Sequence, residues 1–223
     1  EALHEKRIYN FIFSSSAAVY GNPSKTPLTE ESPRSATNPY AASKLIAENI
    51  LLDLAKADDL WKIGILRYFN PVGAHPSGLI GEMPNKIPNN LMPYINLVAN
   101  GDLPHLNIFG GDYDTPDGTA IRDYIHVTDL AQAHVAALKK LKTQNGTDAY
   151  NLGTGLGVSV LELVNAFQES NGIQIPYKIV DRRPGDSESV FADPTKANNK
   201  LKWKANKNLI DMCEDSWRWQ KEF

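Results

Sequence analysis

Two short apolar runs separated by a helical segment constrain the fold of this chain most. Residues 9–13 (YNFIF) and 62–68 (KIGILRY) are almost wholly apolar, which is typical of parallel strands buried on both faces. Between them, Asn38 suits a helix N-cap and Pro39 suits the first helical position, so a helix should run from there to about Lys56. A strand, a helix and a strand in this spacing predict a right-handed βαβ unit and an α/β fold.

Small hydroxyl side chains follow the first apolar run directly. Ser14, Ser15 and Ser16 come after Phe13, and residues 68–73 (YFNPVG) stand at the end of the second run. Open α/β sheets bind ligands at the carboxyl ends of their parallel strands. We therefore expect both strand ends and the start of the helix to meet at one crevice. A serine-rich turn without function would have the same sequence and is the alternative.

A tyrosine and a lysine share one face of the predicted helix. Tyr40 and Lys44 are four residues apart, which brings the ammonium group within reach of the phenol. A nearby cation favours the ionised form of a phenol, so a helix with this spacing can hold a phenolic acid or base. A surface pair on an amphipathic helix is the alternative. The apolar residues of this helix cover more than one stripe, which indicates a second contact surface such as another copy of the chain.

The later segments predict a loop and then further strands and helices. Residues 71–90 read as a loop, after which Asn89 or Asn90 is expected to cap a helix that ends near Ala99. Ser159 and Glu162 form a capping box, and residues 153–157 (GTGLG) indicate a turn because Val158 replaces the third glycine of a dinucleotide loop. Strands are expected over 106–110, 120–127, 149–152 and 177–180, with a helix capped by Thr128 and two C-terminal helices.

Composition argues against several classes of partner. The 223 residues have a net charge of −3, which gives no general electrostatic reason to expect nucleic acid. No apolar run approaches the ~18 residues of a membrane span, and the first residues resemble neither a signal nor a transit peptide. Cys213 is the only cysteine, so we expect no intrachain disulfide and a cytoplasmic location. The five histidines lack metal-ligand spacing, so no metal is expected.

Taken together, seven motifs closely resemble the UDP-glucose 4-epimerase family of extended short-chain dehydrogenases/reductases: SSSAAVYG, NPYAASK, RYFNPVGAHPSG, PNNLMPYI, FGGDYDTPDGTAIRDYIHV, YNLGTG and RRPGD. The resemblance covers essentially the whole chain. It implies the C-terminal part of a Rossmann-like parallel sheet, which binds the dinucleotide, from residues 1–70 and about 124–154. It also implies a smaller α/β domain that binds a UDP-sugar, from about 71–123 and 155–223. The surplus apolar surface of the Tyr40 helix is the reason to expect a homodimer formed through that helix.

The resemblance also implies roles for individual residues. Tyr40 would be the catalytic base, Lys44 would favour its phenolate, and Ser16 would bridge the phenol and the sugar 4′-hydroxyl. These three, with Ser14 and Phe69, are expected at the NAD cofactor. The residues expected to bind UDP-glucose or UDP-galactose are Ser16, Tyr40, Asn70, Asn90, Leu91, Asn107, Phe109, Arg122, Arg183 and Asp186.

The implied activity is NAD-dependent interconversion of UDP-glucose and UDP-galactose, a reaction of galactose metabolism. Hydride passes from C4′ to NAD, the ketose turns over and hydride returns. The family's opening strand, glycine-rich turn and acidic residue are not found after Glu1. We therefore expect about 100 residues of the dinucleotide-binding half to be missing, and the chain alone to bind NAD poorly or to be inactive.

Two alternatives to this activity remain, and Ala17 and Ala18 argue against a third. The chain could be a non-catalytic UDP-sugar-binding or assembly subunit, or a 4-epimerase for another UDP-sugar such as UDP-glucuronate or UDP-arabinose. Related 4,6-dehydratases and decarboxylases place acidic residues just after the position of Ser16, where this chain has Ala17 and Ala18. Val190 lies near the position that sets room for the sugar 2′-substituent, and the fit of UDP-N-acetylhexosamines stays open.

Overall fold

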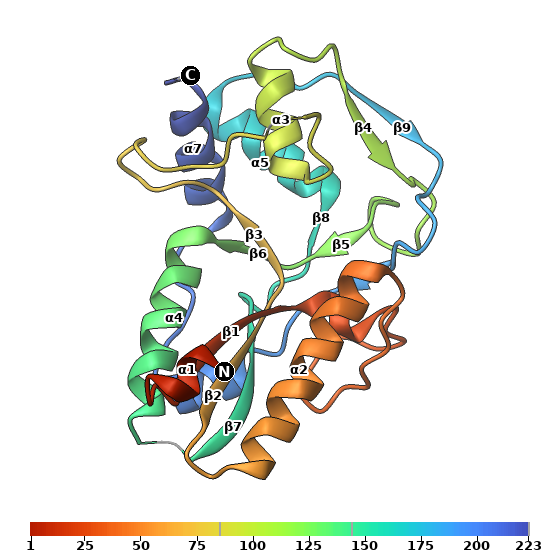
Figure 1. Cartoon of the computed structure of the whole chain (residues 1–223). Helices are drawn as coiled ribbons and strands as arrows, with labels where there is room; N and C mark the ends of the chain where they lie inside the picture. Colours follow the sequence, from red (N-terminus) through yellow and green to blue (C-terminus); the bar gives the residue numbers. More distant parts are fainter. Residues whose placement is uncertain (85, 144, 223) are drawn as a thin grey trace.

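A three-stranded parallel sheet forms one half of the molecule (Figure 1). The structure, a computed structural model, describes residues 1–84, 86–143 and 145–222. Strands β1 (Asn10–Ser16), β2 (Lys62–Tyr68) and β7 (Gly146–Leu152) lie in the order β1-β2-β7. Ser16 pairs with Tyr68, and Tyr68 with Leu152, so the three strands end at one level. The predicted α/β class is confirmed, and β1 is longer than expected because it includes the serines.

Two long helices cover opposite faces of this sheet (Figure 1). Helix α2 (Pro39–Ala57) begins where the sequence predicts, and the side chain of Asn38 accepts a hydrogen bond from the amide of Ala41 at 2.8 Å. Helix α4 (Val127–Leu141) packs Leu130, Ala133 and Ala137 on the other face, against Leu66 and Tyr150. The short helices α1 (Ala2–Glu5) and α6 (Thr195–Leu201) lie beside these elements, and the 3₁₀ helix η1 (Ala17–Tyr20) follows β1 directly.

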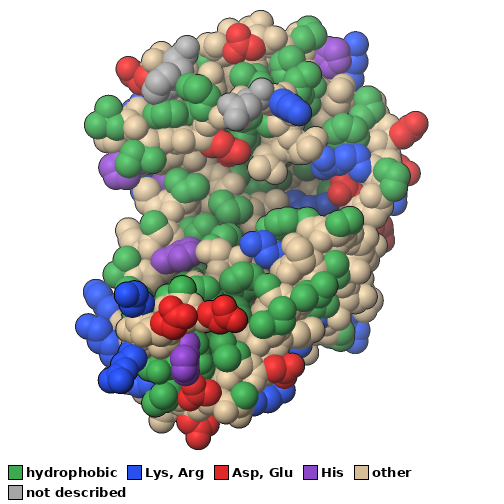
Figure 2. Space-filling model, viewed as in Figure 1, with side chains coloured by type: hydrophobic (Ala, Val, Ile, Leu, Met, Phe, Trp, Pro, Cys, Tyr) green, Lys and Arg blue, Asp and Glu red, His purple; other side chains and the backbone are tan. Residues whose placement is uncertain are grey.

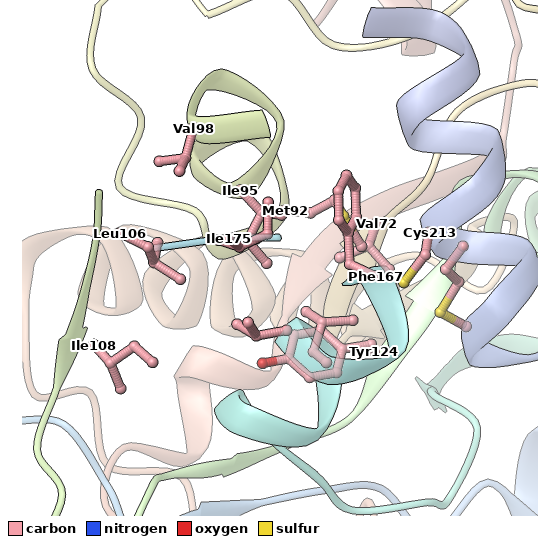
Figure 3. Packing of buried hydrophobic residues seen from close by; sticks show 13 residues of the cluster. Val72, Met92, Ile95, Val98, Leu106, Ile108, Tyr124, Phe167, Ile175 and Cys213 are labelled. Carbon is pink, nitrogen blue, oxygen red and sulfur yellow. The ribbon is translucent and has the colours of Figure 1, made fainter. Parts of the chain in front are cut away.

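The other half of the molecule packs three helices beside a pair of parallel strands. These are α3 (Leu91–Ala99), α5 (Val160–Asn171) and α7 (Leu209–Gln220), with β4 (Leu106–Phe109) paired to β9 (Tyr177–Val180). Figure 3 shows their shared apolar core, in which Ile95 and Phe167 are fully buried. The capping box of Ser159 and Glu162 is present at the start of α5, as predicted. None of the helices described here is long and apolar enough to cross a membrane.

Short strands connect the two halves, and here one prediction was wrong. Instead of one strand over 120–127, the chain forms β5 (Ile121–Arg122) and β6 (Tyr124–His126), with Asp123 between them. Strand β6 pairs with β3 (Asn70–Val72), which overlaps the start of the segment 71–90 expected to be a loop, whereas β5 lies between β8 (Val158–Ser159) and β10 (Ser189–Val190). The buried carboxylate of Asp123 accepts hydrogen bonds from the amides of Thr154, Gly155 and Ala192. These bonds hold the chain at the point where it changes sheets.

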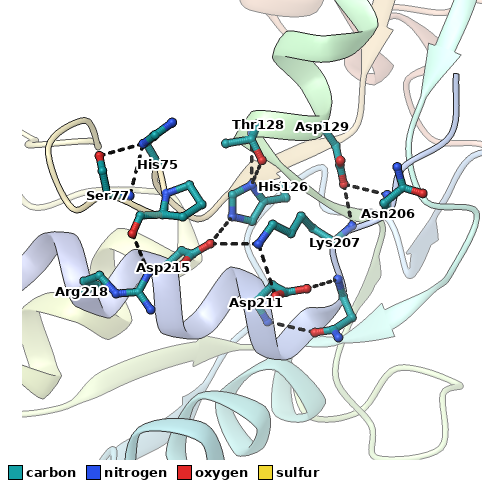
Figure 4. Close-up of polar contacts among 12 residues, drawn as sticks. His75, Ser77, His126, Thr128, Asp129, Asn206, Lys207, Asp211, Asp215 and Arg218 are labelled. Atoms are coloured by element: carbon teal, nitrogen blue, oxygen red, sulfur yellow. Dashed lines mark hydrogen bonds and ion pairs between the residues drawn. The ribbon is translucent and has the colours of Figure 1, made fainter.

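The N-cap of α4 also differs from the prediction. Thr128 was expected to cap this helix, but the N-cap is His126, two residues earlier, and its ring accepts from the amide of Thr128 at 3.1 Å. The Nδ1 atom of His126 is thus an acceptor, so Nε2 bears the proton and donates to Asp215 at 3.2 Å. Figure 4 shows Lys207 and Arg218 beside the same carboxylate. This network, whose members His126 and Asp215 are buried, joins α7 to the start of α4.

Candidate active site

A cleft of about 680 Å³ lies between the two halves of the molecule. Figure 2 shows this face hollowed between the part that holds α3 and the part that holds α2. Of the ten residues predicted to bind substrate, nine line this cleft: Tyr40, Asn70, Asn90, Leu91, Asn107, Phe109, Arg122, Arg183 and Asp186. They come from α2, β3, the start of α3, β4, β5 and the segment after β9. The cleft is therefore built from segments that are far apart in the sequence.

Two arginines, Arg122 and Arg183, line this cleft. The guanidinium of Arg183 donates to Asp186 at 3.1 Å and lies 4.6 Å from the ring centroid of Phe109. Arg122 donates one bond to the carbonyl of Ile121 at 2.8 Å. A guanidinium has five N–H donors, so both arginines retain donors for an anion. Phosphate oxygens suit the guanidinium fork because two parallel bonds can form.

The start of α3 adds backbone donors to the same cleft. Asn90 is the N-cap of this nine-residue helix, and its side chain makes no capping hydrogen bond. The first amides of a helix have no partner within the helix and carry partial positive charge. Leu91 therefore presents a helix N-terminus toward the space that Arg122 and Arg183 also line. The combination suits a diphosphate.

Tyr40 and Lys44 lie close to the end of β1. The ammonium of Lys44 donates to the carbonyl of Ser14 at 2.9 Å and lies 5.7 Å from the ring centroid of Tyr40. The side chain of Tyr40 is 56% exposed. The hydroxyl of Ser16 accepts from the amide of Ala18 at 3.1 Å, which leaves its proton available for donation. These groups form a second polar centre beside the cleft.

Four predicted residues do not line the cleft: Ser14, Ser16, Lys44 and Phe69. Ser14 is exposed and meets Lys44 through its carbonyl. Phe69 is buried among Val19, Leu28 and Ala192, so most of its ring is covered by this chain itself. A ligand at this position would meet the backbone of Phe69 rather than the face of its ring.

Sequence reasoning missed two groups beside this centre. The hydroxyl of Tyr68 bonds Nε2 of His134 at 3.1 Å, and Nδ1 of that ring donates to the carbonyl of Leu130 at 2.8 Å. Burial raises the pKa of Tyr68. The second group is Glu48, which follows Lys44 by four residues and is fully buried. The four-residue spacing of Tyr40, Lys44 and Glu48 was the signal available in the sequence.

The Glu48 carboxylate is compensated by several donors. Burial alone would raise the pKa of Glu48, but hydrogen bonds and charge from Arg67, with bonds from Ser15 and Arg34, hold the pKa below its ordinary value. A charged, fully hydrogen-bonded carboxylate beside β1 is the result. Within the described ranges, no group of three or more His, Cys, Asp or Glu side chains is arranged to hold a metal ion.

The parallel sheet, its flanking helices and the cleft at the strand ends define a Rossmann-like α/β protein. A family model described as GDP-mannose 4,6 dehydratase matches residues 1–216, and the chain belongs to that family. The UDP-glucose 4-epimerase of Bacillus subtilis (strain 168) is 57% identical over 220 residues, which are 99% of this chain and 65% of the relative. The resemblance to UDP-glucose 4-epimerases is thereby confirmed.

Two solved structures extend the comparison. The UDP-glucose 4-epimerase of Stenotrophomonas maltophila, with bound NAD and formylated UDP-arabinopyranose, is 50% identical with a TM-score of 0.97 and is matched over 99% of this chain and 66% of that one. The enzyme of Bifidobacterium longum, in complex with NAD+ and UDP, is 51% identical with a TM-score of 0.94 over the same shares, 99% and 66%. The chain thus spans about two thirds of the length of these relatives.

Proposed function

We propose that this protein interconverts UDP-glucose and UDP-galactose by transient, NAD-dependent oxidation at C4′ of the sugar. One observation supports this most: a tyrosine, two arginines, a helix N-terminus and an aspartate line a single cleft. The tyrosine can exchange a proton, and the other groups suit a nucleoside diphosphate. The relatives named above are UDP-glucose 4-epimerases, and the two solved structures among them hold NAD together with formylated UDP-arabinopyranose or UDP, which supports the same chemistry.

The residues at the end of β1 fit the nicotinamide end of NAD. Lys44 uses one of its three N–H donors on the carbonyl of Ser14, and the others can bind ribose hydroxyls. Ser14 and Tyr40 are exposed beside it. When bound, NAD would supply the acceptor and donor of hydride. We assign Ser14, Ser16, Tyr40, Lys44 and the backbone of Phe69 to this role.

The chain's own residues account for the proton and for orientation. Tyr40 takes the proton of the 4′-hydroxyl and later returns it, and Ser16 donates a hydrogen bond between phenol and sugar. Arg122, Arg183 and the first amides of α3 bind the diphosphate. Because these contacts bind the nucleotide and not the hexose, the oxidised sugar can turn about its link so that the opposite face of C4′ meets the hydride donor, and Tyr40 can return the proton to the same oxygen.

The remaining substrate residues complete the nucleotide site. Asp186 is proposed to bind the uridine ribose, with Asn107 and Phe109 beside the base and Asn70 at the sugar. We further propose that residues 1–70 and about 124–154 belong to the dinucleotide-binding part. The UDP-sugar part would be formed by about 71–123 and 155–223. The cytosol is the proposed compartment, in keeping with the single, buried Cys213.

The direct test is conversion of UDP-galactose in the presence of NAD. The expected result is a mixture of UDP-glucose and UDP-galactose that reaches the same ratio from either side, measured by nuclear magnetic resonance of the anomeric protons. Binding of UDP without any conversion would favour the non-catalytic alternative. Formation of a 4-keto-6-deoxy sugar would indicate a dehydratase, a reaction that the apolar Ala17 and Ala18 disfavour because it needs further acid and base groups.

A homodimer through α2 is the proposed assembly. Ile46 and Ile50 are one helical turn apart on α2 and are 59% and 62% exposed, which is an unusual placement for two large apolar side chains. Glutamate at both positions should convert a dimer into a monomer in sedimentation velocity. A wild-type protein that sediments as a monomer at micromolar concentration would refute the assembly.

A further inference from the structure

Helix α2 bears three polar side chains at four-residue intervals, and only the first of them lines the cleft. These are Tyr40, Lys44 and Glu48, which lie on one face of the helix. Lys44 donates to the carbonyl of Ser14 at 2.9 Å, and Glu48 accepts from the hydroxyl of Ser15 at 2.5 Å. Two successive turns of the helix are therefore bonded to two successive residues of β1.

The Glu48 contact is the more constrained of the two. Its side chain is 0% exposed, and both of its oxygens accept from Arg67 on β2, at 2.9 Å and 2.7 Å. Arg34, from the loop before α2, adds a bond of 2.9 Å. Arg67 in turn donates to the hydroxyl of Tyr20 at 2.9 Å. One carboxylate thus joins α2, β1, β2 and the preceding loop.

Within the described part of the chain, the side chain of Tyr40 has no comparable set of hydrogen bonds. Its side chain is more than half exposed, and its hydroxyl makes no hydrogen bond to any part of the chain that the structure describes. The place of the phenol consequently depends on the place of α2. Ser16 directly follows Ser15, so any slippage of α2 along β1 changes the separation between Tyr40 and Ser16.

We infer that Glu48, together with Arg67, is a positioning residue for the proton transfer at Tyr40, because it fixes the register of α2 against β1. This inference rests on the proposed function. A displacement of about 1 Å at a reacting group can reduce a rate by about 100-fold, whereas binding of a nucleotide depends on other residues that line the cleft, such as Arg122 and Arg183. The effect on turnover is therefore expected to exceed the effect on binding.

A second buried carboxylate provides a matched control. Asp215 on α7 is 4% exposed and accepts from His126, Lys207 and Arg218, and within the part of the chain that the structure describes it makes no hydrogen bond or ion pair with α2. Glu48→Gln and Asp215→Asn each remove one buried charge and keep the side-chain shape. Both variants should have a lower Tm. Only Glu48→Gln should alter the position of α2 against β1.

The experiment compares these variants in the holoenzyme at a temperature where both are folded. We expect kcat for UDP-galactose to fall about 100-fold in Glu48→Gln, with KM and the Kd for UDP changed by less than about twofold. In Asp215→Asn, kcat should stay within about twofold of wild type. Amide hydrogen exchange in residues 40–44 should be faster in Glu48→Gln only. Arg67→Lys keeps the positive charge but loses the paired N–H donors of the guanidinium, so it should give a smaller fall in kcat. This variant replaces Glu48→Gln in the comparison if Glu48→Gln does not fold.

Equal kcat in Glu48→Gln and Asp215→Asn, with equal exchange in residues 40–44, would overturn the inference. A large rise in KM and in the Kd for UDP with unchanged kcat would also overturn it, because that pattern reports lost binding. Absence of turnover in the wild type would refute the proposed function instead. In that case the exchange of residues 40–44 alone decides whether Glu48 fixes the first turn of α2.

Discussion

Replacement of Arg183 by methionine isolates the contribution of one guanidinium to binding of the nucleotide. The aliphatic part of methionine can still cover Phe109, which now lies 4.6 Å from the guanidinium carbon. The ion pair with Asp186 is lost, but the Arg183 side chain is 45% exposed, so this pair contributes about 0–1 kcal/mol to stability. The Tm should therefore change by no more than a few degrees.

The binding of UDP should change much more than stability. A hydrogen bond to a charged group is worth about 1.5–3 kcal/mol, which corresponds to a Kd about 10- to 150-fold higher. Uridine, which lacks the phosphates, should bind Arg183→Met and wild type equally. Isothermal titration calorimetry with both ligands measures the two constants directly.

Arg182 supplies the control for this experiment. Its side chain is also 45% exposed and has its own ion pair, with Asp112 at 2.7 Å, but it does not line the cleft. Arg182→Met should therefore leave the Kd for UDP within about twofold of wild type. Equal losses of UDP affinity in Arg182→Met and Arg183→Met, or equal losses for UDP and uridine in Arg183→Met, would refute a phosphate contact by Arg183.

Three further predictions concern stability. Phe167→Ala should lower the free energy of unfolding by about 3–5 kcal/mol in urea titration, because the ring is fully buried; a loss below 1 kcal/mol would contradict the packing of Figure 3. Gly81→Ala should cost about 1–3 kcal/mol, because a Cβ there would lie only 2.3 Å from the Trp219 ring; an unchanged Tm would contradict this contact. Burial lowers the pKa of His126 below its ordinary 6.5, so the unfolded chain binds more protons there and stability falls as pH decreases from 6.5 toward the folded pKa. His126→Gln should make the stability–pH curve flatter in that window, and an unchanged slope would contradict it.

Much of the fold could be predicted from local sequence patterns. The apolar runs gave β1 and β2, Asn38 and Pro39 gave the start of α2, and Ser159 with Glu162 gave the start of α5. Each of these signals lies within a few residues of the element that it specifies. The parallel pairing of β1 with β2 also followed, because a helix between two strands returns the chain so that both strands run in the same direction.

The predictions that were wrong depend on contacts between residues that are distant in the sequence. A polar residue within an apolar run, Asp123, divides the expected strand because amides from 31 and 69 residues away bind its carboxylate. His126 replaces Thr128 as the N-cap of α4 because its other nitrogen is bonded to Asp215, 89 residues away. No pattern within a short window of sequence contains such a partner.

The candidate site likewise has features that the sequence predicts and features that depend on tertiary contacts. Nine of the predicted substrate residues line one cleft. They lie on six separate segments, so their roles were predicted from the resemblance to a family and could not be predicted from spacing along the sequence. The spacing of Tyr40 and Lys44 was visible in the sequence. The bond from Lys44 to Ser14 and the burial of Glu48 were not, because each depends on how α2 lies against β1.

Tyr40→Phe tests most directly whether a phenol at the start of α2 exchanges a proton with a sugar bound through its UDP. Removal of the hydroxyl should lower kcat for UDP-galactose by about 100- to 10,000-fold, the range of general acid–base catalysis. The Kd for UDP should stay within about twofold of wild type, because Arg122, Arg183 and the start of α3 are unchanged. Turnover in Tyr40→Phe within tenfold of wild type would contradict the role of Tyr40 as the base.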